Sequence, residues 1–152
     1  MEKLLIYIKH HLKFLWNIIE FGNEVVFAQY YGVKLEEVSE KVISEFAEPS
    51  LIYRKLNISD AESLYDLFNS QSPDDLAFFN PHGFDLHVIK KLAGKKSFLM
   101  MGVFSAGKLV GYFFLRFFAN KKCFVGRLID KDFRGKGIGR GMNRIMYEIA
   151  WR

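Results

Sequence analysis

The chain has 152 residues, half of them hydrophobic and 16% aromatic, which excludes a disordered protein and leaves room for about one domain. A formal net charge of +5 and a pI near 9.3 favour an anionic partner: a nucleic acid, a membrane surface or a phosphorylated small molecule. The single cysteine, Cys123, excludes an internal disulfide, and the start of the chain shows no signal-peptide pattern, so we expect a cytoplasmic location.

Residues 4–19 predict an amphipathic helix, because apolar residues recur there at helical spacing while Lys9, His10 and Lys13 lie elsewhere on the helix. A membrane span needs about 20 mostly apolar residues, so this segment is too short and too polar to cross a bilayer. We expect it to pack on a protein surface or to contact a membrane peripherally.

A polar stretch follows and ends at Pro49, where a helix becomes unfavourable. We place a boundary near residue 48. The prediction is an N-terminal helical extension over residues 1–48 and a second domain over residues 49–152.

The second part of the chain alternates between strand and helix patterns. We predict strands over 50–56, 97–104, 108–118 and 123–130, and helices over 59–70, 85–93 and from Ile138 onward. Ser59 and Glu62 have the spacing of a capping box, and Gly94 is expected to end the second helix. Short turns join the last three strands, which predicts an antiparallel meander.

Four glycines at alternating positions, 135, 137, 139 and 141, lie between the last strand and the last helix. Exposed backbone N–H groups and the positive end of the helix dipole can bind an anion there. Gly137 and Gly139 can adopt the positive φ that a tight anion-binding turn requires, and Arg134, Lys136 and Arg140 add charged donors. The run alone is equally compatible with a glycine-rich helix start and solvated charges.

Spacing excludes two familiar phosphate-binding motifs. The dinucleotide fingerprint needs a glycine at the sixth position, which is Arg140 counted from Gly135 and Met142 counted from Gly137. No Gly-Lys-Ser/Thr ending of a P-loop is present. Both motifs also belong to parallel βαβ units, whereas hairpin-linked strands are antiparallel.

The glycine run beginning at Arg134 resembles the signature of the GNAT superfamily of acetyl-CoA-dependent N-acyltransferases. That signature is Arg or Gln, two residues, Gly, one residue, and Gly or Ala. Here it is RGKGIG, residues 134–139. The longer segment GRLIDKDFRGKGIG resembles the family's strand and turn, with Ile129 in place of the usual valine and Lys131 in place of a common proline. YRKLNISDAESLYDLF and GKLVGYFFLRFF resemble its first strand and helix and its third strand, so the resemblance covers residues 50–152.

The resemblance implies an α/β (α+β) fold with a mixed, mostly antiparallel sheet and flanking helices, preceded here by the N-terminal helical segment. It implies direct attack of an amine on the thioester of acetyl-CoA, without an enzyme nucleophile. Backbone amides of residues 135–140 would bind the pyrophosphate, and the strand before them would pair with the pantetheine arm. The implied cofactor-binding residues are Arg127, Leu128, Ile129, Arg134, Gly135, Lys136, Gly137, Ile138, Gly139 and Arg140, and no metal ligand is assigned.

His82 and Asp85, in FFNPHGFD, lie in the loop that would border the acceptor pocket, and histidine readily accepts a proton near neutral pH. The alternative is an ordinary Asn-Pro turn with an exposed histidine. Three further pocket candidates have packing and surface roles as alternatives: Tyr112, Arg116 and Asp130. Cys123 is expected to be a buried filler, and Lys90, Lys91, Lys95 and Lys96 a solvated face.

The family's fifth strand, which walls one side of the pantetheine slot, and its frequent catalytic tyrosine have no counterpart before Arg152. We therefore expect poor turnover from these 152 residues and association into a homo-oligomer through the unpaired edge of strand 123–130. The acceptor is expected to be a small-molecule amine, and a nucleotide-linked amino sugar is compatible with the aromatic-rich loop.

Two other functions compete: a non-catalytic CoA-binding remnant and a basic nucleic-acid-binding module. The phenylalanines alternate as core residues do and are not interleaved with basic residues on one face, so we expect no nucleic-acid partner.

Overall fold

The structure is a computed structural model that describes residues 12–77, 79 and 81–152. Four strands form one sheet in the order β1-β2-β3-β4, with all three pairings antiparallel. The strands are β1 (Ile52–Lys55), β2 (Phe98–Ser105), β3 (Lys108–Phe117) and β4 (Cys123–Ile129). The expected strands and the meander of the last three are confirmed, with ends shifted by at most two residues.

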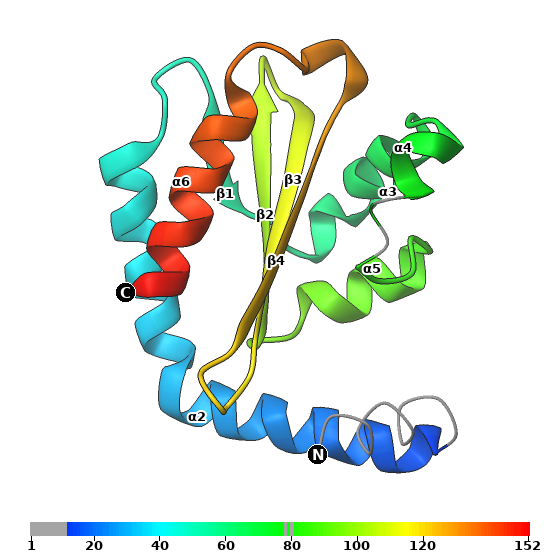
Figure 1. The fold of residues 1–152 in the computed structure, drawn as a ribbon, viewed down its shortest axis with the longest axis vertical. Helices are drawn as coiled ribbons and strands as arrows, with labels where there is room; N and C mark the ends of the chain where they lie inside the picture. Colours follow the sequence, from blue (N-terminus) through cyan, green and yellow to red (C-terminus); the bar gives the residue numbers. More distant parts are fainter. Residues whose placement is uncertain (1–11, 78, 80) are drawn as a thin grey trace.

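Helices cover both faces of the sheet (Figure 1). On one face lie α2 (Lys13–Phe46) and α6 (Ile138–Trp151). On the other lie α3 (Ala61–Asn69), α4 (Pro73–Ala77) and α5 (Leu86–Ala93). The α/β fold class expected from the sequence is therefore confirmed.

The two faces are separated by the alternation of side chains along β3. Phe113 and Leu115 are fully buried against α2 and α6, whereas Tyr112 and Phe114 pack against α3 and α5. Burial on both faces explains why β2 and β3 read as nearly continuous apolar runs in the sequence.

Helix α2 is longer than the helix expected over 4–19, because the polar stretch after it is also helical. Residues 4–11 of that expected helix lie outside the described residues. In the C-terminal part of α2, Glu37 and Glu40 are exposed while Val42 is fully buried against the sheet. The helix ends at Phe46, just before the boundary placed near residue 48, and the division into two domains there stays a prediction.

The N-terminal part of α2 crosses the ends of β2 and β3, and the rest of the helix runs up beside α6 (Figure 1). Asn23 accepts the N–H of Ala119 at 2.8 Å and donates to the Phe117 carbonyl at 3.1 Å. Glu24 accepts three hydrogen bonds, from the N–H groups of Lys96 and Ser97 and from the Ser97 hydroxyl. These contacts supply acceptors for backbone groups at the strand ends.

The start of α3 differs from the expected Ser59–Glu62 capping box. A short 3-10 turn over Ile58–Asp60 precedes the helix. Asn57 accepts the N–H of Ser59 at 2.8 Å, and Asp60 accepts the N–H of Asn57 at 3.0 Å. Arg54 holds Asp60 in place at 2.7 and 2.8 Å, which favours this box over the one two residues later. Gly94 does end α5, although with φ −85° and not in the left-handed conformation.

We expect Glu24→Ala to lower the free energy of unfolding by about 1–3 kcal/mol, because two backbone N–H groups and one hydroxyl lose their acceptor. Urea or thermal unfolding measures this. Glu37→Ala is the matched control, since Glu37 is exposed on the same helix. Equal effects of the two substitutions would show that the Glu24 contacts do not hold α2 on the strand ends.

Candidate functional site

The glycine turn, residues 134–140, begins one short turn after β4 (Figure 1). Asp130 shapes the chain before it by accepting the ammonium of Lys108 at 2.8 Å and the N–H of Asp132 at 3.1 Å. Burial alone would raise the pKa of Asp130, but Lys108 and the Asp132 amide outweigh it and hold that pKa below its usual range. Asp130 is therefore an ionised structural residue and does not line the cavity described below.

Two glycines of the turn adopt the left-handed conformation, Gly135 at φ 76° and Gly137 at φ 86°. The expectation is confirmed for Gly137 and is wrong for Gly139, which lies in the first turn of α6. A β-carbon at Gly139 would meet the Arg127 guanidinium, the mobile end of an exposed side chain that can move aside, and would lie 3.2 Å from Ile129 Cδ1. A positive φ therefore accounts for the glycines at 135 and 137 but not for Gly139.

The backbone N–H groups of residues 135–139 donate no hydrogen bond to any residue that the structure describes. The next N–H, that of Arg140, donates to the Gly137 carbonyl at 2.9 Å. Five free donors therefore surround the positive end of the α6 dipole, beside the exposed side chains of Lys136 and Arg140. This is the arrangement that binds phosphate groups at helix N-termini, and a pyrophosphate fits its charge and its donors.

Arg134 differs from the other two basic residues of the turn. Its guanidinium pairs with Asp75 at 2.7 Å and Gln71 at 3.1 Å, and its Nε donates to the Ile129 carbonyl at 3.1 Å. Arg134 therefore ties the turn to α4 and to the short segment between α3 and α4, and it is not the free anion donor that the sequence suggested.

Along β4, the backbone groups alternate between β3 and the free edge. The N–H of Asp130 donates to the Val110 carbonyl at 2.9 Å, and Leu128 pairs with Tyr112 two residues earlier. The antiparallel pattern therefore turns Leu128 toward β3, and Arg127 and Ile129 away from it. A ligand that adds to this edge as a strand would meet Arg127 and Ile129, but not the backbone of Leu128.

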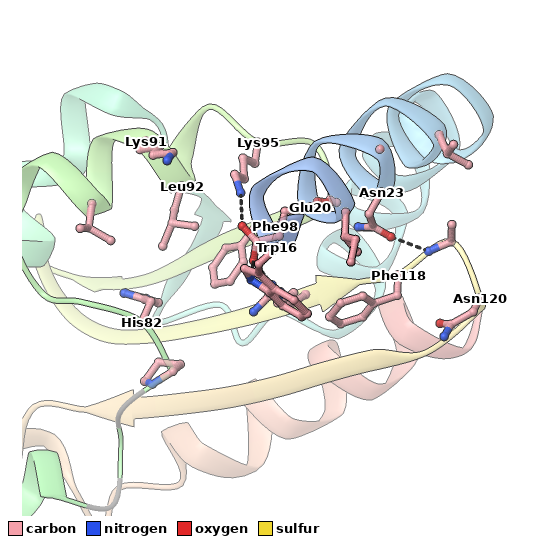
Figure 2. A pocket seen from close by; sticks show the side chains of 18 of the residues that line it. Trp16, Glu20, Asn23, His82, Lys91, Leu92, Lys95, Phe98, Phe118 and Asn120 are labelled. Atoms are coloured by element: carbon pink, nitrogen blue, oxygen red, sulfur yellow. Dashed lines mark hydrogen bonds and ion pairs between the residues drawn. The ribbon is translucent and has the colours of Figure 1, made fainter. Parts of the chain in front are cut away.

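A cavity of about 790 Å³ lies between the N-terminal part of α2, α5 and the adjoining ends of β2 and β3. We call it the α2–α5 cavity. Figure 2 shows side chains of α2 and of the β3–β4 hairpin on one side of it, and Lys91 and Leu92 on another. Its lining includes Trp16, Ile19, Glu20, Asn23, His82, His87, Val88, Lys91, Leu92, Lys95, Phe98, Arg116 and Phe118.

Glu20 receives three donors within this cavity. Arg116 lies 2.5 Å from one carboxylate oxygen, the Trp16 indole N–H donates to the same oxygen at 3.1 Å, and Lys95 lies 3.5 Å from the other. Burial acts to raise the pKa of Glu20, but Lys95 and Arg116 outweigh it and hold the pKa below its usual value. Glu20 is therefore ionised near neutral pH.

His82 has a fixed tautomer. Its Nδ1 lies 2.7 Å from the Gly83 carbonyl, which can only accept, so Nδ1 carries the hydrogen. Its Nε2 lies 3.0 Å from the Tyr112 hydroxyl and accepts from it. Burial lowers the pKa of His82 and raises that of the fully buried Tyr112 well above its usual value. The ring is therefore neutral at neutral pH.

The structure does not bring His82 and Asp85 together. Both ring nitrogens of His82 are engaged by Gly83 and Tyr112, and Asp85 is an exposed residue at the start of α5. Of the other candidates, Arg116 lines the α2–α5 cavity, while Tyr112 lies behind His82. Cys123 is partly buried, which raises the pKa of its thiol to about 11 and suits the expected filler.

Several cavity residues were not predicted from the sequence. Lys91 and Lys95 were expected on a solvated face, yet both line the cavity, and Glu20 and Trp16 were not singled out. One signal was available for Glu20: it and Glu24 are acidic residues four apart in a mostly apolar stretch of the helix, so they share one face.

Solved structures of acetyltransferases share the fold of this chain. No protein-family model and no curated protein sequence matches the chain. Among solved structures, a probable acetyltransferase is similar at 27% identity and a TM-score of 0.55, over 69% of this chain and 65% of that one. The GNAT domain of S. lividans PAT is similar at 16% identity and a TM-score of 0.53, over 64% of each chain.

A third similar structure is the paiA N-acetyltransferase from Thermoplasma acidophilum in complex with coenzyme A. It is 19% identical, with a TM-score of 0.54, over 66% of this chain and 72% of that one. The chain has the fold of the GNAT superfamily of N-acetyltransferases. It spans about two thirds of the length of the solved structures that it matches.

The partly buried, neutral state of His82 predicts a pH dependence of stability. Its pKa in the folded protein lies below the value of about 6.5 in an unfolded chain, so the unfolded state binds more protons as the pH falls. Stability from His82 is therefore complete above pH ~6.5 and is lost as the pH falls through the folded pKa. We expect the difference in thermal stability between wild type and His82→Gln to decrease from pH 7.5 to pH 5.

His87→Gln is the control for this experiment, since His87 is exposed. If the His82 and His87 variants show the same dependence on pH, burial does not keep His82 neutral.

Proposed function

We propose that the protein transfers an acetyl group from acetyl-CoA to a primary amine. One observation carries the proposal: five free backbone N–H groups at the glycine turn lie at the end of the strand whose outer edge is open to a ligand. The pyrophosphate would bind the N–H groups of residues 135–139, and the pantetheine arm would run along the backbone of Arg127 and Ile129. The coenzyme A in the similar T. acidophilum structure supports this choice of ligand.

The acceptor amine would occupy the α2–α5 cavity, whose volume is in the range of small-molecule sites. The amine nitrogen attacks the thioester carbonyl, the carbon–sulfur bond breaks, and the CoA thiolate leaves and takes up a proton. The amine has to lose a proton in this step. His82 is the proton acceptor we propose, because it lines the cavity and is neutral. Its only lone pair, on Nε2, accepts from the Tyr112 hydroxyl in this structure, so the ring has to release that contact before it takes the proton.

We also propose a chemical class for the acceptor. Aromatic side chains of the cavity, Trp16, Phe98 and Phe118, suit a nucleotide-linked amino sugar whose base can stack on them. A CoA-binding protein without turnover is the second candidate. It is favoured by the outer edge of β4, beside which the described residues place no further strand to wall the acyl slot.

Two further partners follow from exposed surfaces. In the described part of segment 4–19, Phe14 and Ile18 are exposed, which supports peripheral contact with a membrane. No helix among the described residues is long and apolar enough to cross one. The open edge of β4, with Phe124 exposed, supports pairing with a second copy of the chain, which would compete with the pantetheine arm for that edge.

The glycine turn is tested by two substitutions of Gly137 that share the same backbone cost. Asp and Asn both place a side chain at φ 86°, but only Asp adds negative charge at the anion site. We expect Gly137→Asp to abolish binding of acetyl-CoA in calorimetry and Gly137→Asn to keep part of it. Unchanged affinity in the Asp variant would refute the assignment of the turn.

His82 is tested by turnover. We expect His82→Gln to lower kcat by about 100-fold to 10,000-fold in a thiol-release assay, with little change in the affinity for acetyl-CoA. His87→Gln, in the same cavity, should keep most of the activity. Equal turnover of the His82 variant and wild type would show that another group takes the proton. Binding of acetyl-CoA without turnover by the wild type on any amine would favour the second candidate.

A further inference from the structure

The charges lining the α2–α5 cavity are unequal. Its described lining holds three basic side chains, Lys91, Lys95 and Arg116, but only one carboxylate, that of Glu20. Lys91 forms no ion pair within the described part of the chain. A site for a polycationic amine would show the reverse balance, because carboxylates pair with ammonium groups.

The single carboxylate of the cavity is surrounded by donors. Arg116 of β3, Lys95 of the segment after α5 and the Trp16 indole N–H of α2 converge on Glu20. The longer Lys95 contact, 3.5 Å, leaves that ammonium free to turn to another anion. Glu20 thus occupies the position that a carboxylate or phosphate of a ligand would take.

His82 lies away from this cluster on the cavity wall (Figure 2). It contacts Tyr112 of β3, the strand beside β4, whereas Lys91 and Lys95 belong to α5 and the segment after it. The cavity therefore has a neutral proton acceptor at one place and a surplus of cations at another. Apolar side chains such as Phe98, Leu92 and Trp16 line it as well.

Resting on the acetyl transfer proposed above, we propose that the acceptor is an amine that also carries an anionic group, a carboxylate or a phosphate. The amine faces His82, and the anionic group binds Lys91 and Lys95 and competes with Glu20 for Arg116. Charge-assisted hydrogen bonds of this kind are stronger than neutral ones and would select such acceptors over uncharged or polycationic amines.

The test measures binding without acetyl-CoA, through the fluorescence of Trp16. Trp151 is 90% exposed, so Trp151→Phe leaves Trp16 as the only tryptophan. Two matched pairs of probes are titrated: phenylalanine against phenethylamine, and glucosamine 6-phosphate against glucosamine. The anionic member of at least one pair should bind about tenfold tighter than its partner, and which pair responds separates a carboxylate from a phosphate ligand.

Variants locate the anion site. Lys91→Gln should weaken the anionic probe about tenfold, whereas Lys90→Gln, the same change on the neighbouring exposed residue, should not. Glu20→Gln keeps an acceptor for the Trp16 N–H but removes the competing negative charge. It should therefore raise the affinity for the anionic probe and leave the affinity for the matched amine without an anionic group unchanged. Thermal unfolding confirms that each variant is folded.

Three results would overturn the inference: no binding of either anionic probe, equal or tighter binding of its partner amine, or weaker binding of every probe in Glu20→Gln, which would make Glu20 the amine anchor. Titration of acetyl-CoA on the same protein separates this failure from that of the acetyl transfer itself. Loss of acetyl-CoA binding would refute the proposed acetyl transfer. The probe titrations would still show whether the α2–α5 cavity prefers amines that carry an anionic group.

Discussion

Two carboxylates one helical turn apart, Glu20 and Glu24, hold α2 across the ends of the central strands. Glu24 accepts from the backbone where β2 begins, and Glu20 pairs with Arg116 near the end of β3. Burying a carboxylate is costly unless cations and N–H groups compensate it, and here both are compensated. The same pair of contacts closes one side of the α2–α5 cavity. Docking of the N-terminal part of α2 therefore also forms one wall of the cavity.

The cofactor side of the site depends on a different constraint, the antiparallel register of β3 and β4. That register turns the backbone of Leu128 inward and that of Arg127 and Ile129 outward. Two left-handed glycines follow in the turn, whose N–H groups at residues 135–139 donate to no described residue. Arg134 fixes this turn against α4 and the segment before it, so the donors would be positioned before a ligand binds, which would lower the ordering cost of binding.

The local parts of this fold could be predicted from the sequence, and the long-range parts could not. Periodicity predicted the strands and α6, and the glycine signature predicted the anion turn, because both depend on neighbours in the chain. The sequence pattern favoured a capping box at Ser59 and Glu62, whereas the Arg54–Asp60 pair holds the box at Asn57 and Asp60 in place. Glu20 and Arg116 are 96 residues apart, and His82 and Tyr112 are 30 apart. No spacing rule predicts such pairs, so the cavity and its charges were missed.

Within the cavity, Glu20 and His82 are driven to opposite protonation states by their surroundings. Two cations keep Glu20 ionised, whereas His82 has no charged partner among the described residues and is neutral because it is buried. Paired groups with environments that push their pKa values apart commonly divide acid–base and binding roles. The surplus of positive charge also acts on the acceptor: nearby cations lower the pKa of an ammonium group and raise the fraction of neutral amine. The lysines that hold the anionic end of an acceptor would therefore also make its other end a better nucleophile.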